Sequence, residues 1–139
     1  LSGAAGNDTI IGGLGSDTLT GGNGNDTFAY SSIADSAFGP LNQDTITGFQ
    51  LSGIFGADRI DLSAIDANLS AAGNQAFTFI GLMGGIIGSP VFSNVGQLGY
   101  QVSAGNLFLY GNVDANLNNA EFALQLSGLA SITAANIAL

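Results

Sequence analysis

The sequence predicts an all-β chain, in which a parallel β-roll of short repeats continues into an antiparallel β-sandwich cap. A nine-residue pattern recurs three times at the start of the chain. Later segments alternate apolar and polar residues, as half-buried strands do, and turns rich in glycine, asparagine and serine separate them. The repeats predict the roll, and the alternating segments predict the cap.

The repeat has the form Gly-Gly-x-Gly-x-Asp-x-apolar-x. It occupies residues 3–11, 12–20 and 21–29. Ala4 is the only departure from the pattern. The apolar residue of each repeat turns inward, so a short strand alternates with a tight turn, and two half-turns of nine residues make one coil. Loops two repeats apart should therefore stack, with Asp8 above Asp26 and Asp17 above Asp35.

The turns of the roll contain the residue types that a calcium site requires. Asp8, Asp17 and Asp26 each supply a carboxylate, and glycine permits the left-handed backbone angles that bring main-chain carbonyls toward one point. Calcium prefers such hard oxygen ligands. A flexible linker is the alternative, but a linker has no reason to keep an apolar residue at each eighth position. We therefore expect several calcium ions between the loops.

The composition excludes several classes of function. The chain of 139 residues carries a net charge of −9, with Arg59 as its single cation, so neither nucleic acid nor an anionic membrane is an expected partner. No apolar run approaches the roughly 20 residues of a membrane-spanning helix. The chain has no cysteine and so forms no disulfide bond, and we expect calcium to stabilise the fold in its place.

We expect no catalytic residues and no enzymatic activity in this chain. Histidine and cysteine are both absent, which excludes zinc hydrolysis, serine-histidine-aspartate catalysis and thiol chemistry. Asp58, Asp61 and Asp66 could supply a carboxylate pair for a glycosidase, but aspartates at turns more often accept hydrogen bonds from backbone amides. Because the chain starts at Leu1, in mid-repeat, we expect a carboxy-terminal piece of a larger protein, with any activity upstream.

The expected elements follow one another as a single continuous structural unit. Residues 1–43 hold the repeats and a following loop, and residues 44–139 form the cap. Strands of the cap are expected at residues 44–49, 57–63, 76–80, 98–102, 107–110 and 122–126. The cap is needed because three nonapeptides make only about one and a half coils, whose ends would expose strand edges. Ile132, Ile137 and Leu139 could pair as a terminal strand.

The chain resembles the carboxy-terminal calcium-binding and secretion domain of serralysin-type metalloproteases, the R-modules of mannuronan epimerases and other RTX proteins. The resemblance is carried by residues 24–32, 35–36, 44–49, 58–63, 73–77 and 126–139. Gly48 departs from it, because the family usually has an aspartate before the phenylalanine.

The resemblance implies a set of metal ligands and an export signal. The carboxylate ligands would be Asp8, Asp17 and Asp26, with Asp35, Asp44 and Asp58 as further candidates. Main-chain carbonyls would come from Ala4, Gly6, Gly13, Gly15, Gly22 and Gly24. The carboxy-terminal segment would be an uncleaved signal read by a type I secretion system, which predicts a secreted, extracellular or cell-surface protein.

Three functions remain open on the sequence alone. The first is a non-catalytic RTX module that folds on extracellular calcium and carries the export signal of a larger protein. The second is a calcium-dependent, self-assembling subunit of a surface layer, fibre or adhesin, which the apolar residues 80–91 suggest. The third is a polysaccharide-binding module with Tyr100 and Tyr110 stacked on sugar rings, although a chain with one arginine suits a polyanion poorly.

Overall fold

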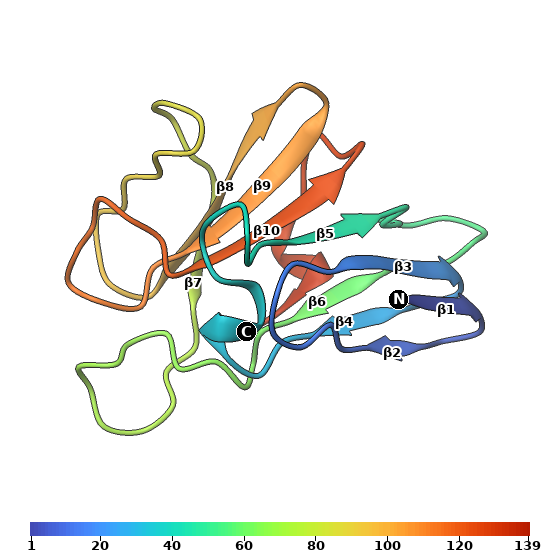
Figure 1. Cartoon of the computed structure of the whole chain (residues 1–139), viewed down its shortest axis with the longest axis horizontal. Helices are drawn as coiled ribbons and strands as arrows, with labels where there is room; N and C mark the ends of the chain where they lie inside the picture. Colours follow the sequence, from blue (N-terminus) through green and yellow to red (C-terminus); the bar gives the residue numbers. More distant parts are fainter.

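Two β-sheets pack against one core in the computed structural model, which describes all 139 residues (Figure 1). The larger sheet contains, in spatial order, β1 (Ser2–Ala5), β3 (Thr18–Asn23), β5 (Asp44–Thr47), β10 (Phe122–Ser127), β9 (Asn106–Gly111), β8 (Gln97–Ser103) and β7 (Thr78–Leu82). The smaller sheet contains β11 (Ile137–Ala138), β6 (Arg59–Asp61), β4 (Thr27–Ala29) and β2 (Thr9–Ile10).

The first six strands form a parallel roll, because the chain passes from one sheet to the other at each half-turn. The roll extends past the expected residues 1–43, since β5 and β6 belong to it although their residues were assigned to the cap. β1, β3 and β5 pair in parallel in the larger sheet, and β2, β4 and β6 pair in parallel in the smaller one. Thr9 lies beside Thr27, so neighbouring turns in that sheet are 18 residues apart, as two nonapeptides require. Figure 1 shows these strands stacked at the amino-terminal end of the molecule.

The cap extends the larger sheet of the roll. β10 runs parallel to β5 and antiparallel to β9, and β9 is antiparallel to β8. The predicted boundaries of β7, β8, β9 and β10 lie within two residues of the observed ones. The all-β fold class, a parallel roll continuing into antiparallel strands, is therefore confirmed.

The connection between β4 and β5 leaves the nine-residue period. It contains a short 3-10 helix (Ile33–Ser36) that begins with a capping box: Ser32 accepts from the amide of Ala34, and Asp35 accepts in return from Ser32. A second 3-10 helix (Ala134–Asn136) precedes β11. β11 pairs in parallel with β6, which gives the carboxy-terminal strand that the sequence suggested.

The core lies between the two sheets and joins the roll to the cap. Its largest fully buried side chains include Phe28 and Ile60 from the smaller sheet and Leu19, Leu109 and Phe122 from the larger one. These side chains occupy the inward-facing positions of the strands, so the alternation in the sequence is the alternation across each sheet. No helix of the chain has the length and apolar character needed to cross a membrane.

Candidate calcium sites in the stacked loops

The aspartates of the repeats stack in two columns, one at each side of the roll. In the first column, the amide N–H of Asp8 donates to Oδ1 of Asp26 over 2.9 Å, and the amide of Asp26 donates to Oδ1 of Asp58 over 3.1 Å. In the second column, the amide of Asp17 donates to Oδ1 of Asp44 over 2.8 Å. One carboxylate oxygen of each lower aspartate therefore fixes the loop above it.

The second carboxylate oxygen of several of these aspartates has no partner within the protein. Oδ2 of Asp8, Asp26 and Asp44 is buried and makes no hydrogen bond. A buried, unpaired carboxylate oxygen is costly, and the chain offers no lysine to neutralise it. An oxygen-seeking cation would supply the missing partner, so the residues present fit calcium.

The first glycine of each repeat leaves room for these carboxylates. A Cβ atom on Gly12 would lie 3.0 Å from Oδ2 of Asp44 and 3.2 Å from Oδ2 of Asp17, so both oxygens approach one point. A Cβ atom on Gly3 would lie 2.6 Å from Oδ2 of Asp8, and one on Gly21 would collide with Oδ2 of Asp26. Any side chain at these positions would fill the space toward which the carboxylates point.

The second and third glycines let the loops touch through their backbones. Gly22 and Gly24 have φ angles of 107° and 137°, which only glycine adopts easily. A Cβ atom on Gly22 would overlap the carbonyl oxygen of Ala4, and one on Gly24 would overlap that of Gly6. The structure thus brings the predicted carbonyl ligands of the first and third repeats into one stack. The side-chain Nε2 of Gln50 donates to the Gly22 carbonyl over 2.8 Å and extends this stack.

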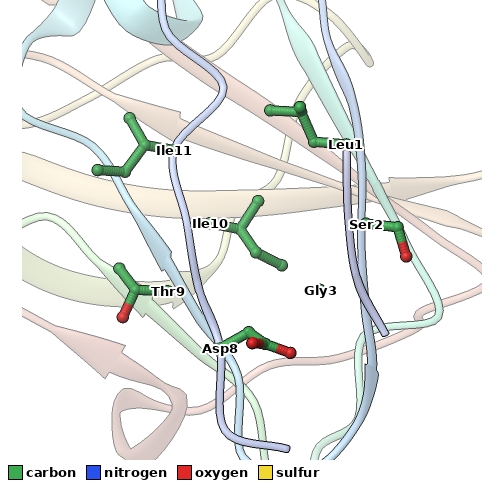
Figure 2. A pocket seen from close by; sticks show the side chains of 7 residues that line it. All are labelled: Leu1, Ser2, Gly3, Asp8, Thr9, Ile10 and Ile11. Carbon is green, nitrogen blue, oxygen red and sulfur yellow. The ribbon is translucent and has the colours of Figure 1, made fainter. Parts of the chain in front are cut away.

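The first and second repeats occupy the open end of the roll. Gly13 and Gly15 also have positive φ angles, of 85° and 109°, but a Cβ atom there would meet nothing within 4 Å. Figure 2 shows the pocket at this end, where the Asp8 carboxylate and the Ile10 side chain point toward the strand that carries Gly3. The terminal coil therefore presents a loop surface that no part of this chain covers.

The predicted stacking of Asp17 on Asp35 was wrong. Oδ2 of Asp35 accepts hydrogen bonds from Ser31 N, Ser31 Oγ and Ser32 N, at 2.9, 3.0 and 3.0 Å, and caps the first 3-10 helix. The 13 residues between Tyr30 and Asp44 form that helix and its turns instead of a nonapeptide. Asp44 rather than Asp35 therefore stacks on Asp17.

Asp58 is more central than the sequence suggested. It lies outside the nonapeptide repeats, yet its two carboxylate oxygens accept from the amides of Asp26 and Gln50, at 3.1 and 2.9 Å. The alternation of residues 57–63 indicated a strand but gave no sign that this strand completes the first aspartate column.

Burial raises the pKa of two lower aspartates, Asp44 and Asp58. Burial, together with the negative charge of Asp17, raises the pKa of Asp44 to about 6, although a hydrogen bond from the Asp17 amide acts in the opposite direction. Burial likewise raises the pKa of Asp58, against hydrogen bonds from the amides of Gln50 and Asp26. Both columns therefore hold charge that the protein itself does not balance.

The proposed aromatic platform for sugars is not present at the surface. Tyr100 and Tyr110 are 8% and 3% exposed. Tyr100 stacks on Phe79 with ring centroids 6.3 Å apart, and Tyr110 contacts Phe38 at 5.8 Å. Both rings pack within the protein, which is the usual role of strand aromatics.

Comparisons with known proteins agree with this geometry. The family model for the C terminus of the serralysins, the M10 peptidases, matches residues 2–138. The chain belongs to this serralysin C-terminal family. No curated protein sequence matches it.

Two solved structures of similar fold come from the mannuronan C5-epimerase of Azotobacter vinelandii. One R-module subunit is 28% identical, with a TM-score of 0.58, over 98% of this chain and 65% of that structure. Another subunit of the same enzyme is 26% identical, with a TM-score of 0.55, over 94% of this chain and 70% of that structure. This serralysin-type chain is thus an RTX-like module, and it spans less than two thirds of the first of these structures.

Proposed function

We propose that the chain is a non-catalytic calcium-binding module of a larger secreted protein, and that it folds when it meets extracellular calcium. The observation that carries this proposal is the pair of aspartate columns with buried, unpartnered Oδ2 atoms at Asp8, Asp26 and Asp44. Membership of the serralysin C-terminal family supports it.

Ligand binding explains how calcium would control folding. Without metal, like charges lie close together in loops that touch through their backbones, which destabilises the roll. Calcium binds only the folded arrangement, so it stabilises the fold by RT ln(1 + [Ca²⁺]/Kd). Extracellular calcium modules have Kd values of roughly 10⁻⁴ to 10⁻³ M, so the chain stays unfolded at low cytosolic calcium.

The proposed ligands follow the two columns. Carboxylates come from Asp8, Asp17, Asp26, Asp44 and Asp58, and carbonyls from Ala4, Gly6, Gly13, Gly15, Gly22 and Gly24. Asp35 leaves this set, because it lies in the first 3-10 helix outside both columns and its Oδ2 atom accepts three hydrogen bonds from the serines before that helix.

The carboxy-terminal segment, residues 131–139, is the proposed type I secretion signal. In the folded chain, Ile132 and Ile137 are only 3% and 5% exposed, and β11 is hydrogen-bonded to β6. A receptor could read these side chains only before folding. The same residues would then serve recognition in the unfolded chain and packing in the folded one.

Two experiments test the proposal separately. Circular dichroism of the metal-free chain should show loss of strand signal, which millimolar calcium restores and magnesium restores far less, because magnesium demands a tighter octahedral shell. A metal-free chain that stays fully folded would contradict the folding mechanism. Deletion of residues 131–139 should abolish export from a type I secretion host, and normal export of the truncated chain would place the signal elsewhere.

A calcium-dependent structural subunit is the second candidate. The segment that includes β7 and the loop after it exposes Leu82, Ile86 and Val91 at 67%, 78% and 60%, a row of apolar side chains suited to subunit contact. Sedimentation with and without calcium separates the two proposals. A monomer under both conditions supports the export module, and calcium-dependent assembly supports the subunit.

A further inference from the structure

The loop between β9 and β10, residues 112–121, holds a second group of buried oxygens without hydrogen-bond partners (Figure 1, the orange-red loop at the left). These atoms are Asn112 Oδ1, Asn119 Oδ1 and Glu121 Oε1. No other loop outside the repeats contains more than one such atom. The loop therefore shares the feature that marks the aspartate columns, although it has no nonapeptide sequence.

The orientation of Asn112 is fixed by its own contacts. This side chain is 0% exposed, and its Nδ2 donates to the main-chain oxygens of Asn116 and Asn119 at 2.9 and 3.5 Å. Exchanging the amide oxygen and nitrogen would set Oδ1 against two acceptors, so the unpartnered atom is the oxygen. A buried amide oxygen of this kind is expected to have a partner.

Contacts of Glu121 and Asn112 join the two ends of the loop at its mouth, where β9 ends and β10 begins. Gly111 and Phe122 are the last paired residues of β9 and β10, and the amide of Glu121 donates to the Gly111 carbonyl over 3.0 Å. Glu121 Oε2 accepts from the amide of Val113 at 2.9 Å, while Asn112 Nδ2 reaches back to Asn119. These contacts bring residues 112, 119 and 121 together at the mouth of the loop.

The charge of the loop is also unbalanced. Asp114 and Glu121 are the acidic residues of the loop, and the loop contains no basic residue. The chain has no lysine or histidine, and its only arginine, Arg59, lies in the smaller sheet. The atoms available to a metal ion are carboxylate and amide oxygens, with no nitrogen or sulfur ligand. Such a set of ligands selects a hard cation.

We propose that the loop of residues 112–121 binds one calcium ion through Glu121 Oε1, Asn112 Oδ1 and Asn119 Oδ1, separately from the nonapeptide loops. Calcium accepts mixed carboxylate and amide oxygens in irregular geometry, and water or main-chain oxygens complete its six to eight ligands. Magnesium requires a near-ideal octahedron, which a loop of this kind does not supply.

Native mass spectrometry of the full chain in calcium acetate counts the ions bound. Glu121→Gln keeps the acceptor for Val113 but removes the charge, and it should bind one ion fewer than the unaltered chain. Asp66→Asn is the matched control, since Asp66 Oδ1 accepts from the amides of Asn68 and Gln75 and leaves no buried oxygen unpaired. An unchanged ion count in Glu121→Gln would overturn the proposal.

A second measurement keeps the test decisive if Glu121→Gln does not fold. Asn119→Asp adds a carboxylate to the site, so it should lower the calcium concentration that half-saturates the loop by about tenfold, because ligand charge sets affinity. The side-chain amide signals of Asn112, followed by NMR during titration with calcium chloride, report this site. If the Asn112 signals do not shift with calcium, or if Asn119→Asp leaves the half-saturating calcium concentration unchanged, no ion binds there. Buried water then satisfies these oxygens.

Discussion

Oδ1 of Asp26 accepts the amide N–H of Asp8 at 2.9 Å, so the Asp26 carboxylate holds the loop above it and also carries charge. The Oδ1 atom holds the loop above, and the buried Oδ2 atom has no partner in the chain. The hydrogen bond lies within the protein, whereas the unpartnered oxygen is the atom through which calcium would stabilise the fold in the proposed function. A substitution that keeps the first atom and changes the second can separate these roles.

Asp26→Asn should weaken the response to calcium without removing the loop contact. The amide Oδ1 still accepts from Asp8, but the column loses a charged ligand, so the calcium concentration at the folding midpoint should rise by about tenfold or more. Circular dichroism titrations compare this variant with Asp66→Asn, which removes the same charge outside the columns. Equal midpoints for the two variants would argue against ligands in the columns.

The pH dependence of stability should change sign with calcium. Burial raises the pKa of Asp44 from 3.8 to about 6, so the folded, metal-free chain holds this proton more tightly than the unfolded chain. Asp44 then stabilises the metal-free fold below about pH 4, and this contribution, at most about 3 kcal/mol, is lost as the pH rises through 6.

With calcium bound, acid should act in the opposite direction, because protons compete with the ion for carboxylates. Urea melts of the metal-free and the calcium-loaded chain between pH 4.5 and 7.5 measure both slopes. Asp44→Asn should flatten the metal-free slope. A metal-free chain that becomes less stable on acidification in this range would contradict the assignment.

Ala4→Gly should stabilise the chain. Ala4 has a φ angle of 83°, a left-handed conformation that costs an alanine roughly 1–2 kcal/mol. Glycine removes this strain but adds freedom to the unfolded chain, so the net gain is about 1 kcal/mol or less. Ala5→Gly is the control: Ala5 lies in β1 without a positive φ angle, and its replacement should destabilise by roughly 0.5–1 kcal/mol. Melting temperatures that fall in both variants would refute the strain argument.

Ala4 also shows how far the sequence predicted the structure. Its place in the repeat was clear, but only the structure shows that it lies at the open end, where no loop above it forbids a side chain. The nine-residue period predicted Asp8 above Asp26, because both loops lie within unbroken repeats. It failed at Asp35, since the capping serines offer that carboxylate local partners and start a helix.

The Asn112–Glu121 cluster could not be predicted in the same way. Its oxygens come together through the pairing of β9 with β10, and the loop has no repeated spacing to draw attention to it. Alternating Asn and Asp at residues 112, 114 and 116 was the only local signal. Asx turns give the same pattern, as the hydrogen bond from the Asn116 amide to Asp114 shows.

Ile137→Ala should destabilise the chain by about 2–5 kcal/mol. Ile137 is 5% exposed and lies in the core between the sheets, where it sits beside Ile60, so its truncation leaves a cavity. Ile54→Ala removes the same atoms from a side chain that is 93% exposed and should change stability by less than about 0.5 kcal/mol. Urea denaturation in saturating calcium compares them, and equal effects would mean that the carboxy-terminal strand does not pack in solution.

Gly22→Ala should be far more damaging than Gly13→Ala, although both glycines occupy the same place in the repeat. Their φ angles are 107° and 85°, so an alanine at either position destabilises the fold by roughly 1–2 kcal/mol because its backbone is left-handed. At Gly13 the new Cβ atom meets nothing within 4 Å, but at Gly22 it overlaps the carbonyl oxygen of Ala4. The first coil must then separate from the second, which removes a proposed carbonyl ligand and should raise the total cost to roughly 3 kcal/mol or more. Thermal melts in saturating calcium measure the difference, and similar melting temperatures for the two variants would show that the loops do not stack at backbone contact.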